Sequence, residues 1–368
     1  MVEGPCLAYI VRDTYTRSIL NIHGELHSMR ELARVGESKL ETPHTGPRVV
    51  VVGPPGSGRT TLAMTLVNYG ARLNPMLYLD LDVSQNEISL SGMLSCVAVD
   101  RPVMPHIGWS SSHVLSFPFG HISPSSNSKL YGHELVQLLK SVESKEEAFP
   151  ETRASGWIAK APSFDSAESY QIVLDTIKSL HPHIIVVLGY DRLVHDFTAL
   201  LSDRMDKKLL HIVNVSRSSG IIYYGANQVE NQRQLRIRDY FYGPSRELGP
   251  ARISLPFGEK FVVVQLKLQD QISITAMPID QEAPAEAELE VLPITPDRQL
   301  KHHILAVSYA HSIEQVLFSN IAGYLHVLDV DMEKSKIVCT SPLERIETGS
   351  SGGTIFLINT EFKFTDVE

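Results

Sequence analysis

The glycine-rich segment that follows a run of valines constrains the fold of this chain more than any other feature. Val49–Val52 is a continuous β-branched run, as expected of a strand buried on both faces. The next residues are Gly53, Pro54, Pro55, Gly56, Ser57, Gly58, Arg59, Thr60 and Thr61. Except at Arg59, they fit the G-x-x-x-x-G-K-[ST] pattern of a phosphate-binding loop, or P-loop. We therefore predict a strand, a phosphate-cradling turn and a helix over residues 49–68.

Each position of this segment has a chemical reason. Glycines let the backbone curl so that successive N–H groups point inward and form an anion nest, to which the following helix adds its positive end. Thr60 supplies a hydroxyl for Mg²⁺. The usual lysine places a compact charge on the β- and γ-phosphates, whereas Arg59 is planar and larger, so the change is not conservative. The alternative is a strand–helix turn without a ligand, and the flanking strand and helix make phosphate binding the better interpretation.

Residues 46–250 alternate apolar runs with helical patterns, which is typical of parallel α/β construction. We predict a P-loop NTPase-like parallel sheet flanked by helices. The strands are predicted at Val49–Val52, Met76–Leu81, Ile184–Leu188 and Leu209–Val215. The helices are predicted at Thr60–Asn68, Tyr131–Ser144 and Ser166–Leu180, and the arginine-containing stretch Tyr223–Tyr242 is predicted to be helical and mobile.

The two flanking regions have a different texture. In residues 1–45 we predict two strands, Leu7–Val11 and Ser18–Ile22, a helix at His27–Val35 and then a linker. Residues 251–368 contain short alternating runs that predict a smaller, mostly-β C-terminal domain. These runs are Phe261–Leu268, Ile272–Ala276, His303–Tyr309, Gly323–Val330, Lys336–Thr340 and Thr354–Ile358, with Gln281–Glu290 expected to be a surface loop.

Composition excludes several classes of protein. Cys6, Cys96 and Cys339 are far apart and lack metal-ligand spacing, so we expect reduced thiols and no zinc site. No run of about 18 apolar residues predicts a membrane span, and Met1–Leu7 lacks the features of a secretory signal. The formal net charge of −9 argues against a protein whose main affinity comes from neutralising a phosphate backbone, although a local basic groove stays open, and we expect no DNA partner.

Three further side chains are candidates for the chemistry. Asp82 follows a predicted strand and is placed to hold Mg²⁺ or accept a proton, or else it is a cap or a solvated acid. Gln85 is a candidate for a hydrogen bond to phosphate or water, and simple exposure is its alternative. Arg233, with Arg236 and Arg238, is placed to close over a triphosphate, and the alternative is a solvated helix face with an ion pair to Glu230 or Asp239. The pair at positions 302 and 303 is interpreted as structural histidine, because neighbours in a strand point to opposite faces.

Several long stretches resemble the Clp-type polyribonucleotide 5′-hydroxyl kinases, which are also subunits of the pre-mRNA 3′-end cleavage factor. The resemblance covers about residues 7–368. The stretches that carry it are GPRVVVVGPPGSGRTT (46–61), LVNYGARL (66–73), YLDLDVSQNEISLSG (78–92), FGHISPSSNSKLY (119–131), IRDYFYG (237–243) and VLPITPDRQLKHHILAVS (291–308).

The resemblance implies three domains, ATP and Mg²⁺ as cofactors, and a nuclear role. The first domain is a β domain that helps to hold the adenine, and of it only residues 7–22 would be retained here. In active members the P-loop lysine and threonine bind phosphate and Mg²⁺, and an aspartate activates the RNA 5′-hydroxyl. These roles map to Arg59, Thr60 and Asp82, with Gln85 alongside.

The chain departs from that pattern at three catalytic elements. The P-loop lysine is Arg59. The family's T-x-G-W segment becomes Ala161-Pro162-Ser163-Phe164, which lacks the threonine, the glycine and the tryptophan. The family's lid has two arginines four residues apart; Arg233 matches the second, but Val229 stands at the first. Each loss removes transition-state charge stabilisation, which together costs a kinase several orders of magnitude in rate.

Three hypotheses follow from this combination. In the first, a catalytically degenerate, ATP-binding member serves mainly as a scaffold with other cleavage and polyadenylation factor subunits in the nucleus. In the second, the chain is an active ATP-dependent RNA 5′-hydroxyl kinase of mRNA or tRNA processing, with Asp82 as base and Arg233 as lid charge. In the third, it acts in tRNA or rRNA maturation through another complex, such as one with tRNA-splicing endonuclease subunits.

Overall fold

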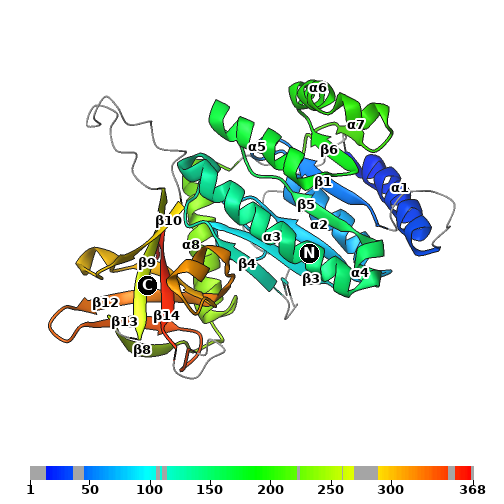
Figure 1. Ribbon diagram of the computed structural model, residues 1–368. Helices are drawn as coiled ribbons and strands as arrows, with labels where there is room; N and C mark the ends of the chain where they lie inside the picture. The colour runs from blue at the N-terminus through cyan, green and yellow to red at the C-terminus, as the bar shows by residue number, and fades with distance from the viewer. Residues whose placement is uncertain are drawn as a thin grey trace, which may run out of the picture. The chain divides into compact units, whose positions relative to one another are not determined.

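The computed structural model describes residues 14–35, 45–104, 108–109, 114–221, 224–258, 260–268, 289–346 and 353–365. Within these ranges the chain forms two seven-stranded sheets (Figure 1). The chain divides into two compact units, which are described separately below. The P-loop unit comprises residues 1–79, 97–113 and 144–225, and the second unit comprises residues 80–96, 114–143 and 226–368.

The first sheet is built around the valine run. Its order is β4-β3-β2-β5-β1-β6-β7. The central strand β1 (Arg48–Val52) pairs in parallel with β5 (Trp157–Lys160) and with β6 (Ile184–Leu188), and β6 pairs in parallel with β7 (His211–Val215). The other strands are β2 (Met76–Asp80), β3 (Met93–Val99) and β4 (Val114–Pro118). Four of the five residues of β1 and all five of β6 are buried, as expected for strands covered on both faces.

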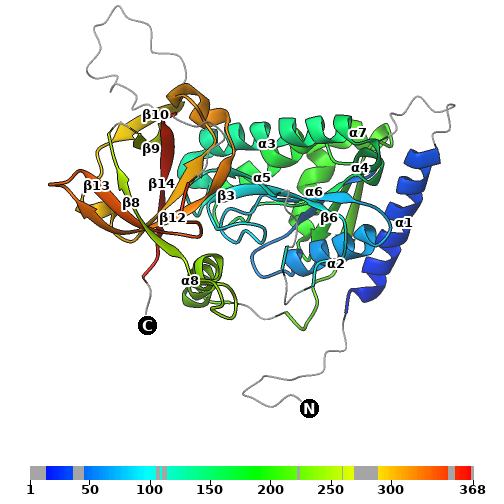
Figure 2. The ribbon, with the colours of Figure 1, turned by 90° about the horizontal axis from the view of Figure 1, so that it is seen from below.

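Helices cover the strands of the P-loop unit. The chain leaves β1 through α2 (Arg59–Ala71) toward β2, and it leaves β5 through α5 (Ala167–Leu180) toward β6, in the opposite direction along the sheet. Because such crossovers are right-handed, the two helices lie on opposite faces, as Figure 2 shows. Ser166 and Ser169 form a capping box that fixes the start of α5. The short helices α4 (Pro150–Ser155), α6 (Asp191–Leu200) and α7 (Ser202–Asp206) complete this unit.

The N-terminal part of the described chain is a helix, α1 (Thr16–Val35), which packs against α2 and α4 (Figure 2). The predicted strand at Ser18–Ile22 is therefore wrong, whereas the predicted helix at His27–Val35 is confirmed. The buried residues Ile19, Ile22, Leu26 and Arg30 are spaced three or four apart. This helical spacing extends through the segment that a shorter window presents as a strand. The predicted strand at Leu7–Val11 lies outside the described residues.

The second unit contains the second sheet, whose order is β10-β9-β14-β11-β12-β13-β8. Its strands are β8 (Ala251–Pro256), β9 (Phe261–Leu268), β10 (Leu289–Ile294), β11 (His303–Ser308), β12 (Ile321–Asp331), β13 (Lys336–Ser341) and β14 (Ile355–Lys363). All neighbours are antiparallel except β14 and β9, which are parallel. The mostly-β C-terminal sheet is as predicted.

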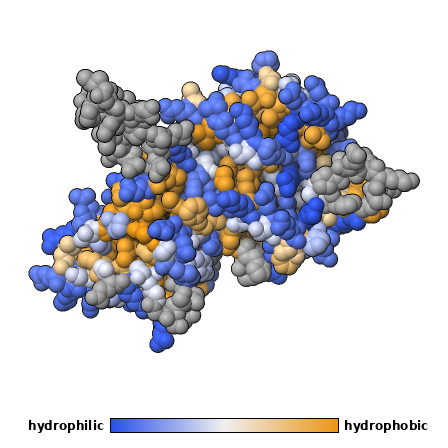
Figure 3. Space-filling model, viewed as in Figure 1, coloured by the Kyte–Doolittle hydropathy of each residue, from blue (hydrophilic) through white to orange (hydrophobic). Residues whose placement is uncertain are grey.

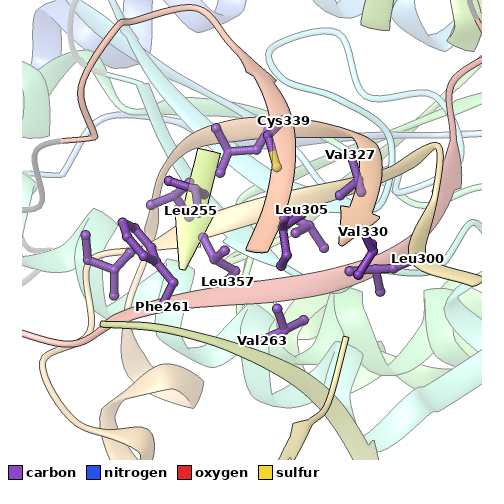
Figure 4. Packing of buried hydrophobic residues seen from close by; sticks show 13 residues of the cluster. Leu255, Phe261, Val263, Leu300, Leu305, Val327, Val330, Cys339 and Leu357 are labelled. Carbon is purple, nitrogen blue, oxygen red and sulfur yellow. The ribbon is translucent and has the colours of Figure 1, made fainter. Parts of the chain in front are cut away.

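One core cluster holds this sheet together. Thirteen buried residues, including Leu305, Val327, Cys339 and Leu357, pack against one another (Figure 4). At the edge, apolar residues gather over β9 and β10 (Figure 3), with Val262, Val291 and Ile294 half-buried. The edge strand β10 carries Pro293 and Glu290, residue types that discourage pairing with another chain.

Two helices accompany the second sheet. Most of α3 (Ser128–Ala148) and all of α8 (Ala226–Tyr242) belong to this unit. On α3, His133 Nε2 lies 2.9 Å from the Leu317 carbonyl oxygen, and its ring contacts Phe318. The next residue of the same helix, Glu134, is fully buried, and both of its carboxylate oxygens lack a hydrogen-bond partner in the part of the chain that is described. Burial raises the pKa of this carboxyl well above its usual value.

The sequence-based elements are mostly confirmed. The helices predicted at 60–68 and 131–144 are present and extend further, the helix predicted at 166–180 is present over 167–180, and α8 confirms a helix over most of 223–242. The strands β3, β4, β5, β8 and β10 were not predicted. Leu289 and Glu290 belong to β10, so the expected loop at 281–290 is wrong at its last two residues. The strand predicted at Ile272–Ala276 lies outside the described residues, and the mobility of α8 stays a prediction.

Candidate functional site

The P-loop is closed by glycines that no other residue can replace without strain. Gly56 and Gly58 have φ values of +67° and +92°, in the left-handed region. A Cβ on Gly58 would lie 3.3 Å from both Ile221 Cδ1 and the Tyr15 hydroxyl. A Cβ on Gly53 would lie 2.6 Å from Ser57 Oγ. The backbone therefore turns tightly over residues 53–58, as a phosphate nest requires.

The start of α2 presents backbone N–H groups to an anion. Gly58 is its N-cap and has no side chain to cap the first turn. The first four N–H groups of a helix lack intrahelical partners and carry a partial positive charge. Ser57 Oγ is fully buried beneath the loop and has no partner among the described residues. Backbone amides without a side-chain cap and a buried hydroxyl without a described partner can both donate to a phosphate group. This segment therefore fits the phosphate ligand that its sequence predicts.

Arg59 lies at the lysine position but its guanidinium is bound to the protein. Nη1 donates to the Ala161 carbonyl oxygen at 2.7 Å, and Nη2 donates to Ser163 Oγ at 2.6 Å. The residue is 6% exposed. Both acceptors belong to the segment that follows β5, so the arginine ties the P-loop to residues 161–163. The sequence placed Arg59 and Ala161–Phe164 in one candidate site, and the structure brings them into contact.

Two cations of the P-loop unit were missed by the sequence analysis. Lys160 is the last residue of β5, is 1% exposed and pairs in register with Val51 of β1. Arg217 follows β7 and is exposed, and its Nη2 donates to the Gly56 carbonyl oxygen at 3.3 Å. Neither residue lies in a recognisable motif. Only their place at the carboxyl ends of parallel strands, where α/β proteins bind ligands, could have identified them.

Thr60 and Thr61 begin α2, with Thr60 half-buried and Thr61 exposed. Pro54 and Pro55 form the first turn of the loop, in which Ser57 N donates to the Pro54 carbonyl oxygen at 3.2 Å. The roles of these residues toward a nucleotide or Mg²⁺ stay predictions.

Asp82, Gln85 and Arg233 belong to the second unit. Asp82 is 1% exposed, and its Oδ1 accepts from Ser84 N at 3.2 Å and from Ser84 Oγ at 2.7 Å. Gln85 N donates to the Asp82 carbonyl oxygen at 3.2 Å. Arg233 Nε donates to the Ser84 carbonyl oxygen at 3.0 Å. These three candidates therefore meet around Ser84, and the turn at 82–85 fixes the aspartate carboxylate.

The arginines of α8 are held by nearby groups. Arg233 Nη1 also pairs with Glu230 at 2.9 Å, and its side chain is 15% exposed. Arg236 pairs with Glu87 and donates to the Asn86 carbonyl oxygen. Arg238 pairs with its neighbour Asp239 at 2.8 Å. The ion pairs to Glu230 and Asp239 that the sequence offered as the alternative are present, together with contacts to Ser84, Asn86 and Glu87 that it did not foresee. A lid role for Arg233 requires that its bonds to Ser84 and Glu230 be broken.

Other candidate features have local explanations. His303 begins β11, and its Nδ1 lies 3.1 Å from Asn359 Oδ1 and 3.0 Å from the Thr360 carbonyl oxygen. Among the described residues no three His, Cys, Asp or Glu side chains gather in a metal-binding arrangement. In the same residues, no helix has both the length and the apolar character to cross a membrane.

Family comparison identifies both halves of the chain. Residues 53–243 match the model described as mRNA cleavage and polyadenylation factor CLP1 P-loop. Residues 248–366 match the model described as pre-mRNA cleavage complex II protein Clp1. The chain belongs to the Clp1 family. The predicted resemblance is thereby confirmed, and the Clp1 P-loop match spans the nest, Asp82, Gln85 and Arg233.

Relatives from distant organisms share most of the chain. The CLP1 homolog of Arabidopsis thaliana is 30% identical over 336 residues, which are 91% of this chain and 74% of the relative. The CLP1 homolog of Aedes aegypti is 32% identical over 345 residues, covering 93% and 78%. The homolog of Nematostella vectensis is 30% identical over 369 residues, covering 99% and 82%.

Solved structures share the Clp1 fold. A wild-type Clp1p–Pcf11p complex superimposes with a TM-score of 0.75 at 22% identity, over 95% of this chain and 79% of the other. A second structure, which describes an extended Pcf11p–Clp1p interface and ATP loss in a glycine-to-arginine point mutant, superimposes with a TM-score of 0.74 at 22% identity, over 95% and 80%. At this identity the likeness establishes the fold alone.

Proposed function

We propose that this Clp1-family chain is an ATP-binding subunit of the nuclear pre-mRNA 3′-end cleavage and polyadenylation machinery that acts mainly as a scaffold and no longer as an efficient kinase. The observation that carries the proposal is the engagement of Arg59 with Ala161 and Ser163. The residue at the lysine position of a working P-loop has to reach the β- and γ-phosphates. Here it serves instead as a tie between two loops.

The energy of that tie opposes a catalytic role. A hydrogen bond to a charged group contributes about 1.5–3 kcal/mol, so two of them hold Arg59 by roughly 3–6 kcal/mol. A swing toward phosphate has to repay this amount, which corresponds to about 10²–10⁴ in an equilibrium constant. The nest itself does not need Arg59, because its amides and the start of α2 are separate donors. Nucleotide binding without efficient phosphoryl transfer is therefore the function that this geometry favours.

ATP is the proposed nucleotide, with Gly53–Thr61 as its phosphate site and Gln85 as a candidate second contact. Thr60 and Asp82 are the proposed Mg²⁺ ligands, and a bound Mg²⁺ would supply charge neutralisation on the phosphates. Within the protein, the tie from Arg59 to the 161–163 segment holds the P-loop in its curled form. Occupation of the nest would stabilise the same loop, so the nucleotide acts as a structural element of the P-loop unit.

Two measurements on one sample test the enzymatic part. The protein is purified without added nucleotide, the bound small molecules are released and identified, and a 5′-hydroxyl RNA is then offered with ATP and Mg²⁺. We expect bound adenine nucleotide and RNA phosphorylation at background level, with an active kinase of the family as positive control. Phosphorylation that depends on Asp82, lost in Asp82→Ala and altered in Arg59→Lys, would establish the kinase alternative instead.

A third measurement tests the partners and the location. A tagged chain expressed at native level is captured, and the co-purifying proteins are identified by mass spectrometry. We expect cleavage and polyadenylation factor subunits, and a nuclear signal from the same tag. Capture of tRNA-splicing endonuclease subunits in their place would move the protein to tRNA maturation.

A further inference from the structure

Arg217 is the second arginine that contacts the P-loop, and its exposure and hydrogen bonding are opposite to those of Arg59. Arg59 is buried and donates at 2.7 Å and 2.6 Å to acceptors outside the loop. Arg217 is exposed and donates once, at 3.3 Å, to the carbonyl oxygen of Gly56 within the loop. A guanidinium has five donors, and within the described chain those of Arg217 have no other protein acceptor.

The backbone at Arg217 is closely packed even though the guanidinium is exposed and makes a single long hydrogen bond. A Cβ on Gly189 would lie 2.7 Å from Arg217 Cβ and 3.3 Å from its backbone nitrogen. Gly189 N donates to the Val215 carbonyl oxygen at 2.9 Å, which joins the ends of β6 and β7. The close packing at Gly189 thus brings residue 217 to the edge of the loop, at the carboxyl ends of the strands where phosphates bind in α/β folds.

We propose that Arg217 binds the phosphate chain of the nucleotide and provides the mobile positive charge that Arg59 does not. The inference rests on the proposed nucleotide-binding function and names the residue that would confer its preference for a polyphosphate. The bond to Gly56 is at the long end of the hydrogen-bond range and is made to a neutral acceptor. A phosphate oxygen in the adjoining nest is a charged acceptor that the planar guanidinium can bind with two parallel donors. Arg217 would therefore exchange the carbonyl for the ligand.

The ligand class follows from this position. The nest binds one phosphate group through backbone donors, and a cation at its edge adds affinity only for a ligand whose charge continues beyond that group. We therefore expect Arg217 to strengthen binding of nucleoside triphosphates and inorganic tripolyphosphate. Tripolyphosphate has no adenine or ribose, so an effect of Arg217 on its affinity identifies a contact to the phosphates.

The test uses the full chain and a fluorescent ATP analogue, displaced by unlabelled ATP or by inorganic tripolyphosphate. Arg217→Ala is compared with Arg217→Lys and with Arg72→Ala, which removes an exposed arginine at the C-cap of α2. With 13 residues in α2, that control lies about 20 Å along the helix from the nest. Thermal unfolding without ligand is recorded for each variant, and we expect no change from the parent chain.

The expected result is a loss of about ten-fold or more in affinity for both ATP and tripolyphosphate in Arg217→Ala, the change that one charged hydrogen bond provides. Arg217→Lys should recover part of it, and Arg72→Ala should bind like the parent chain. Unchanged tripolyphosphate affinity in Arg217→Ala, or an equal loss in Arg72→Ala, overturns the inference while nucleotide binding stands. A parent chain that binds neither ligand overturns the proposed nucleotide binding as well, which is a different outcome.

Discussion

Replacing Glu134 by leucine should stabilise the second unit, because this carboxyl is buried on α3 with no described partner for either oxygen. An unsatisfied buried polar group costs about 1–3 kcal/mol. We therefore expect Glu134→Leu to raise the free energy of unfolding by on the order of 2 kcal/mol at pH 7. For a folding unit of 150–250 residues, that corresponds to roughly 4–8 °C in Tm.

The pH dependence of the same residue gives the sharper test. Burial raises the pKa of Glu134 well above its usual value of 4.5, so the folded state binds a proton more tightly than the unfolded state does. The contribution of the protonated Glu134 to the free energy of unfolding is fully present below pH 4.5. It is lost as the pH rises through the raised pKa. Glu134→Gln keeps the shape and cannot ionise, so its stability advantage over the parent chain should be absent at low pH and grow as the pH rises.

Chemical denaturation monitored by circular dichroism, repeated between pH 4 and 8, measures this difference. Glu143→Gln is the matched control, because it removes an exposed glutamate from the same helix. Its curve should run parallel to that of the parent chain. The reasoning is refuted if the Glu134→Gln curve also runs parallel to the parent, or if Glu134→Leu lowers stability at pH 7.

Two further predictions concern the P-loop and a thiol. Gly58→Ala should lower the free energy of unfolding by about 1–2 kcal/mol and weaken ATP binding, because its φ of +92° is unfavourable for alanine and the new Cβ meets Ile221 and Tyr15. The control is Gly132→Ala on α3, where a Cβ meets nothing within 4 Å. A fluorescence titration should show that this control keeps the affinity for ATP. Cys339 should resist iodoacetamide at pH 8 in the native state and react in concentrated urea, because it is buried and burial raises its pKa to about 12; rapid native alkylation seen by mass spectrometry would contradict this.

The sequence predicted the local parts of the site and not its long-range contacts. The strand, the turn and α2 follow from residues within 20 positions of one another, so spacing alone identifies them. The acceptors of Arg59 lie 102 and 104 positions away. No local pattern could show that the arginine at the lysine position binds Ala161 and Ser163, two of the residues that differ from the family's segment.

The strands and helices that were misassigned share a physical cause. The strand β5 has four residues, one of them Lys160, so neither length nor apolar character marks it as central. The segment Ser18–Ile22 is apolar enough for a strand, and its helical identity depends on Leu26 and Arg30 further along the chain. Glu134 is buried although its charge would place it on the exposed face of α3. In each case tertiary packing overrides local preference.

The parallel pair of β14 and β9 has a consequence for how the second sheet is made. β14 lies between β9 and β11, so the last strand of the described chain occupies an interior position in the sheet. Until the chain is translated through Lys363, β9 with β10 and the group from β11 to β8 have no strand to join them. Contacts between strands this far apart in sequence form slowly, because a long loop must close before they stabilise anything. The C-terminal sheet therefore closes only once β14 has been made, and a chain cut short before Ile355 would contain two half-sheets with no strand to join them.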